Sequence, residues 1–105
     1  MEINFRKKYL LELYEDGKTT KKKYNFPEYI IKAYQLRIEI LRRTQQIEEL
    51  FTLNSLEYKK LGGDKEGISS IRINDGYRIE FIVKQDDSEE GITVCDILKL
   101  SNHYE

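Results

Sequence analysis

Residues 69–83 read Ser-Ser-Ile-Arg-Ile-Asn-Asp-Gly-Tyr-Arg-Ile-Glu-Phe-Ile-Val, and this stretch decides the fold of the 105-residue chain. Apolar and polar residues alternate on both sides of Asn74-Asp75-Gly76, as in strands that bury one face. The Asp-Gly pair tolerates the positive φ that a tight hairpin turn needs. The stretch therefore predicts two paired antiparallel strands. Arg72 and Arg78 should share one face, because both are opposite in parity to the apolar residues.

The flanking segments extend this sheet. On the carboxyl side, an acidic loop over residues 85–91 leads to a third apolar-rich strand over 92–100. On the amino side, residues 55–61 are expected to be extended, and Gly62-Gly63-Asp64 interrupts the chain before the hairpin.

The first half of the chain shows helical periodicity instead. A short strand over residues 1–5 passes into a short helix that ends at Asp16-Gly17, and the polar run 18–25 is expected to be a loop. After Pro27, apolar residues four, four and three positions apart form the stripe of a longer helix: Ile30, Tyr34, Ile38 and Leu41. A shorter helical piece follows near residues 47–51. These elements predict one α+β domain spanning residues 1–105, with two amino-terminal helices and an antiparallel sheet.

Composition narrows the class of protein. Hydrophobic residues make up 39% and charged residues 35% of the chain, which predicts a folded domain with a modest core. Neither a long apolar run nor a secretory leader is evident, so we expect a cytoplasmic protein. Cys95 is the single cysteine, which rules out an internal disulfide, and with one histidine there is no Cys/His set for zinc. A buried, inert thiol is expected there.

The net charge of −1 conceals an uneven distribution. Residues 1–43 carry a net +5 and residues 44–105 a net −6. Lys21-Lys22-Lys23 would suit contacts with phosphates, although a solvated loop explains the same run. Since the overall pI is near 5.9, any contact with RNA must come from a local patch.

A longer motif suggests a family. Residues 54–81 read Asn-Ser-Leu-Glu-Tyr-Lys-Lys-Leu-Gly-Gly-Asp-Lys-Glu-Gly-Ile-Ser-Ser-Ile-Arg-Ile-Asn-Asp-Gly-Tyr-Arg-Ile-Glu-Phe, and the tail is Leu100-Ser-Asn-His-Tyr104. This pattern resembles the HigB-like killer toxins, plasmid maintenance proteins of the RelE/ParE superfamily. The resemblance implies helices packed on a curved antiparallel sheet whose concave face meets the A-site codon on the ribosome. The implied reaction is RNA transesterification without a metal or other cofactor.

Such a reaction needs a base for the 2′-hydroxyl, cations for the phosphorane and an acid for the 5′-oxygen. The resemblance assigns catalysis to four residues: Lys60, Arg78, His103 and Tyr104. The fork of Arg78 suits a phosphate oxygen, and a cross-strand ion pair is its alternative. Histidine is the residue type whose ordinary pKa lies near neutrality, which suits His103 to acid–base work, but a terminal histidine is often only solvated. Tyr104 would stack on a base or orient the 2′-hydroxyl.

Three further cations, Lys59, Lys65 and Arg72, are predicted to contact RNA. The alternative for Lys59 and Lys60 is that both are solvated residues at the end of a strand. Gly62 departs from the family, which usually has a lysine there. Lys60 would then act alone, or Lys65 would reach into the site. Tyr77 is expected to be structural.

Two other functions share these features. A ParE-like toxin has the same fold but inhibits DNA gyrase, and a binding module would serve only its antitoxin. The family also implies a partner, a HigA-like helix-turn-helix antitoxin that often forms a heterotetramer with its toxin. It would cover part of the sheet or of the basic helix face, whose cations are Lys32, Arg37, Arg42 and Arg43.

Overall fold

The computed structural model describes residues 1–74, 76–85 and 93–102. The elements in chain order are β1 (Glu2–Phe5), α1 (Lys8–Asp16), η1 (Lys22–Tyr24), α2 (Glu28–Arg43), α3 (Glu48–Phe51), η2 (Asn54–Leu56), β2 (Lys59–Lys60), η3 (Gly63–Lys65), β3 (Ser69–Asn74), β4 (Tyr77–Gln85) and β5 (Thr93–Asn102). The predicted acidic loop, apart from Gln85, lies outside the described residues, and so do Asp75 of the predicted turn, His103 and Tyr104.

The strands form one sheet in the order β1-β5-β4-β3-β2. The predicted α+β class and the β3–β4 hairpin are confirmed, and β5 extends the sheet as expected. The predicted strands pair antiparallel, and the sheet as a whole is mixed because β1 adds to its edge in parallel with β5, with Ile3 opposite Cys95. Helices follow β1 and carry the chain away before β2 begins, so β1 is free to join the far edge beside the last strand.

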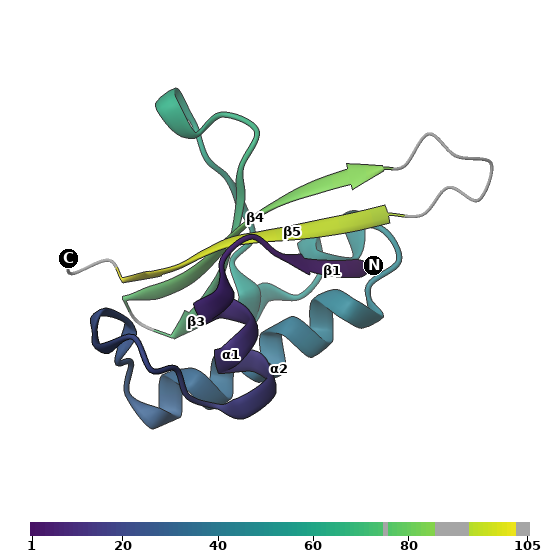
Figure 1. Cartoon of the computed structure of the whole chain (residues 1–105). Coiled ribbons are helices and arrows are strands. Elements are labelled where there is room, and N and C mark those ends of the chain that lie inside the picture. Colours follow the sequence, from purple (N-terminus) through teal and green to yellow (C-terminus); the bar gives the residue numbers. More distant parts are fainter. Residues whose placement is uncertain (75, 86–92, 103–105) are drawn as a thin grey trace.

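Helices α1 and α2 cover one face of the sheet (Figure 1). The predicted stripe on α2 is confirmed, since its four apolar residues are fully buried against that face. Tyr34 is among them, and its hydroxyl donates to the carbonyl of Leu10 at 2.8 Å, so no polar atom is buried without a partner there. Cys95 is buried as expected, and burial raises the pKa of its thiol to about 12.

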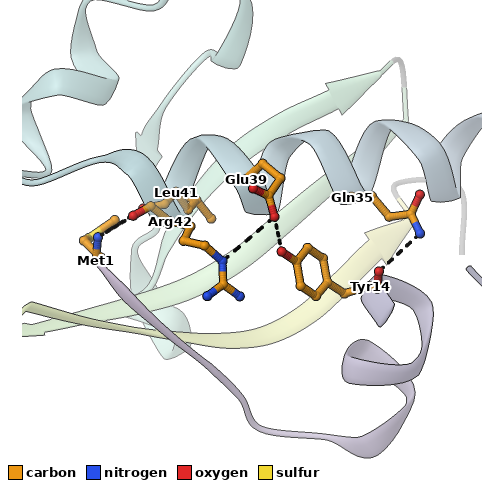
Figure 2. A network of polar contacts seen from close by, with 6 residues as sticks. All are labelled: Met1, Tyr14, Gln35, Glu39, Leu41 and Arg42. Atoms are coloured by element: carbon orange, nitrogen blue, oxygen red, sulfur yellow. Dashed lines mark hydrogen bonds and ion pairs between the residues drawn. The ribbon is translucent and has the colours of Figure 1, made fainter. Parts of the chain in front are cut away.

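A polar layer joins α1, α2 and the amino terminus (Figure 2). The hydroxyl of Tyr14 donates to the carboxylate of Glu39, which Arg42 also approaches at 3.9 Å. The amide of Gln35 donates to the carbonyl of Tyr14 at 3.3 Å. The amino group of Met1 donates to the carbonyl of Arg42 at 2.9 Å. This carbonyl lies at the carboxyl end of α2, where the helix dipole favours a positive charge. The contacts of Tyr14 tie α1 to α2, and Met1 ties the amino terminus to the end of α2.

The segment before the hairpin differs from the prediction. Residues 55–61 were expected to be extended, but η2 turns the chain first and only Lys59–Lys60 pairs as a strand. The turn is needed because Leu56 is 1% exposed and must point into the core. The predicted loop over 18–25 also contains one turn of 3-10 helix, η1.

Candidate functional site

The face of β3 and β4 that points away from the helices carries a set of charged side chains. Arg72 lies directly opposite Arg78, and Ser70 lies opposite Glu80. Directly opposed residues share a face of the sheet. The predicted placement of both arginines on one surface is therefore confirmed.

The guanidinium of Arg78 is held on several sides. Its Nε donates to the Ser70 hydroxyl, and one terminal nitrogen donates to the carbonyls of Glu57 and Ser70. The other terminal nitrogen lies 3.8 Å from the Glu57 carboxylate. The expected alternative of an ion pair is thus present. The acidic partner, Glu57, comes from the turn before β2 and not from a neighbouring strand. The Arg78 side chain remains 23% exposed in this arrangement.

A third arginine reaches the backbone of β3 from the helix layer. The Nε of Arg37 on α2 donates to the carbonyl of Arg72 at 3.2 Å. Burial lowers the pKa of Arg37, and the charge of Arg72 lowers it further. Burial also lowers the pKa of Arg78; the Glu57 carboxylate opposes that shift, and Arg72 adds to it. Arg37 and Arg78 therefore both lie close enough to Arg72 to be affected by its charge, and a bound anion would relieve that repulsion.

The two lysines of β2 point to different sides. Lys59 pairs with Ser70, in the row of Glu80, whereas Lys60 pairs with Ser69, in the row of the buried Phe81. Successive side chains of a strand alternate between the two faces of a sheet. Lys59 therefore lies on the face that carries Arg72 and Arg78, the arginine face, and Lys60 lies on the opposite face. Both lysines are exposed.

Lys65 reaches the sheet but is engaged there. It belongs to η3, in the loop that stands out from the sheet on the side away from α1 and α2 (Figure 1). Its ammonium lies 3.1 and 3.2 Å from the two carboxylate oxygens of Glu80, a side chain that is 8% exposed. The charge of Lys65 is therefore directed at a protein carboxylate.

The opposite end of the same face is neutralised in a similar way. Asp96 on β5 accepts from Asn4 at 2.9 Å and from Arg6 at 2.8 Å, and Lys84 lies 3.3 Å away. Burial alone would raise the pKa of Asp96, but these three groups together lower it. Arg6 and Lys84 are thus engaged with a protein carboxylate at this end of the face.

Glu57 and Arg37 were not predicted as site residues. Glu57 is the one non-glycine residue with positive φ in the described ranges, at 41°, and this turn carries its carboxylate to Arg78, which is 21 residues later in the chain. No local pattern reveals that contact. Arg37 follows the buried residue Tyr34 by three positions on α2. This spacing places Arg37 beside the face of the helix that packs on the sheet, and it is the sequence feature that indicates the contact.

Other predictions have mixed outcomes. Tyr77 packs edge-on against Phe26 with ring centroids 6.1 Å apart, consistent with its structural role. The roles predicted for His103 and Tyr104 lie outside the described residues and stay predictions. Within residues 1–74, 76–85 and 93–102, no group of three His, Cys, Asp or Glu side chains is placed to hold a metal ion.

Comparison with known proteins places this chain in a family. The model of the "RelE-like toxin of type II toxin-antitoxin system HigB" matches residues 3–93. The chain belongs to this HigB-like family. It is therefore a toxin of a type II toxin-antitoxin system, and such toxins pair with an antitoxin.

A solved structure supports the fold. The YoeB/ParE toxin from Agrobacterium tumefaciens superimposes with a TM-score of 0.60, covering 99% of this chain and 100% of that one. The sequences are 17% identical, so this likeness establishes the RelE/ParE fold alone. Comparison with curated proteins finds no match. In the part of the toxin that the structure describes, no helix is both long and apolar enough to span a bilayer.

Proposed function

We propose that this HigB-like toxin is a ribosome-dependent endoribonuclease that cuts mRNA in the cytoplasm and thereby stops translation. The observation that carries the proposal is the common face of Arg72 and Arg78 on β3 and β4, with the exposed carboxylate of Glu57 beside Arg78. Guanidinium groups stabilise charge on a phosphorane, and a nearby carboxylate accepts a proton. These groups suit transesterification within an RNA chain.

In the proposed reaction, the 2′-oxygen attacks the adjacent phosphorus, the bond from phosphorus to the 5′-oxygen breaks, and a 2′,3′-cyclic phosphate remains. Arg78 and Arg72 bind the non-bridging oxygens, and Lys59 contacts a neighbouring phosphate from the same face. The Glu57 carboxylate takes the 2′-proton, because it lies next to Arg78 and is 54% exposed. His103 returns a proton to the 5′-oxygen, and Tyr104 orients the sugar.

The test is induction of the toxin without its antitoxin, followed by mapping of mRNA 5′ ends. We expect growth to stop and new ends to appear within translated codons. Arg78→Ala and His103→Ala should each relieve the arrest while the protein remains folded. Arg43→Ala is the matched control, because Arg43 is an exposed arginine at the end of α2 and should leave cleavage unchanged. Growth arrest with intact mRNA and reduced DNA supercoiling would instead identify a ParE-like gyrase inhibitor.

The antitoxin is proposed to be a HigA-like helix-turn-helix protein that covers the outer side of α2 in a heterotetramer. This side carries exposed Lys32 and Arg43 beside two exposed apolar residues, Tyr29 and Leu36, whereas Arg42 turns towards Tyr14 of α1. Arg37 is excluded from it, because its side chain turns to β3. Leu36→Asp should weaken the purified complex without weakening RNA cleavage by the free toxin, as measured by light scattering and by cleavage assays. An undiminished complex would contradict this placement.

A further inference from the structure

Next to the arginine site lies a pocket of about 460 Å³ that the proposed chemistry does not use. It is lined by Phe51, Leu53, Asn54, Glu57, Tyr58 and Lys60. Glu57 connects the two places, because it lines this pocket and also bonds Arg78. The pocket therefore continues from the arginine face around the edge of the sheet at β2.

The pocket displays large apolar side chains at the surface. Phe51 is 51% exposed and Leu53 is 42% exposed, whereas Leu50 and Leu56 on either side are buried. The two buried leucines anchor the segment in the core, and the turn between them holds the intervening residues outward. Exposed apolar side chains that line one hollow commonly mark a binding site.

The aromatic wall of this pocket is held by contacts with the sheet. The rings of Phe51 and Tyr58 lie 4.8 Å apart at an angle of 44°. The Tyr58 hydroxyl lies 2.8 Å from the Ser69 hydroxyl on β3, which ties the pair to the sheet. A preorganised aromatic surface loses little entropy when a flat ring stacks on it.

We propose that this pocket binds a nucleobase of the RNA strand, one that flanks the phosphate held at Arg78. Phe51 supplies the stacking surface, and the exposed amide of Asn54 offers both a donor and an acceptor to a base edge. Lys60, which points to this side of β2, meets the adjoining phosphate. The identity of the ligand as RNA rests on the proposed function.

A neighbouring hollow gives the strand room to continue. It encloses about 1180 Å³ and shares Phe51, Tyr58 and Lys60 with the first. Gly62 and Gly63 also line it, and a Cβ added at either would meet nothing within 4 Å. A second nucleotide therefore has room to lie beyond Lys60, even beside a longer side chain at position 62, and this room favours an extended single strand as the occupant.

Binding is tested by fluorescence, because the chain contains no tryptophan. Phe51→Trp preserves a stacking surface and adds a reporter, and Tyr29→Trp places the same reporter on α2, outside the pocket. Titration with hexa-adenylate and hexa-uridylate should quench Phe51→Trp saturably and leave Tyr29→Trp unchanged. A hexamer of abasic sugar-phosphate should bind about tenfold or more weakly. Equal quenching of both variants, or equal affinity for the abasic hexamer, would overturn the proposal.

Cleavage on programmed ribosomes separates this inference from the proposed function. Phe51→Ala should lower kcat/KM by about tenfold, mainly through KM, and reduce the differences between codons, whereas Arg78→Ala should abolish cleavage of every codon. If the wild type cuts mRNA and Phe51→Ala cuts with unchanged preference, the pocket assignment fails while the function stands. If RNA bases quench Phe51→Trp but the wild-type protein cuts no mRNA, the pocket assignment stands and the nuclease function fails. Self-association lost in Phe51→Ala, without any response to RNA, would make the pocket a protein interface.

Discussion

Replacing Gly62 by lysine is expected to strengthen the toxin without harming its fold. The resemblance to the HigB-like motif implies a lysine at this position, and Gly62 lines the same hollow as Lys60, so Gly62→Lys adds a cation there. The backbone at Gly62 has φ −117° and ψ −175°, an extended conformation that any residue adopts. No heavy atom lies within 4 Å of a Cβ built there. We therefore expect the free energy of unfolding to change by less than about 0.5 kcal/mol.

The gain in activity follows from the added charge. Removing one preorganised donor from a site of this kind typically costs about 10²–10³-fold in rate. An exposed lysine on a loop is less well fixed, so we expect Gly62→Lys to raise the rate of cleavage by about tenfold. The assay measures single-turnover cleavage of mRNA on programmed ribosomes, with urea denaturation as the measure of stability.

The adjacent glycine provides the control. Gly63 has φ +62°, a conformation that costs other residues about 1–2 kcal/mol, so Gly63→Lys should lower Tm by several degrees. It adds the same charge one residue away, and no gain in rate is expected. An unchanged rate in Gly62→Lys, or an equal gain in both variants, would refute the assignment of this position to the site.

Four other outcomes are expected. Glu57→Gly should reduce cleavage about 100-fold yet raise the free energy of unfolding by up to about 1 kcal/mol, because glycine relieves the positive φ; a fully active variant would remove Glu57 from the mechanism. Lys65→Met should lower the free energy of unfolding, measured by urea denaturation, by about 1 kcal/mol, and adding Glu80→Gln should restore part of that free energy. The folded pKa of Asp96 is lowered, so its stabilisation is complete above about pH 4 and is lost as the pH falls through the folded pKa; Asp96→Asn should flatten acid unfolding followed by circular dichroism. Burial raises the pKa of Cys95 to about 12, so Ellman's reagent at pH 8 should label it only after denaturation, and labelling of the native protein would contradict its burial.

Periodicity gave a reliable account of the elements that bury a face. The stripe on α2 and the alternation in β4 were predicted because each buried residue repeats at the spacing of its own helix or strand. The pairing of β1 with β5 was not predicted, since hydrogen bonds between residues about 90 positions apart leave no local pattern. The η2 turn was missed for a related reason, as it depends on where Leu56 finds space in the core.

The candidate site divides along the same line. The sequence by itself determined the family, the hairpin and the common face of Arg72 and Arg78, because strand parity and a contiguous motif are properties of the local chain. Only the tertiary structure decided that Glu57 meets Arg78, that Arg37 leaves the basic helix face for β3, and that Lys65 is bound to Glu80. These contacts join separate elements, and their geometry is fixed by how the helices and loops pack on the sheet.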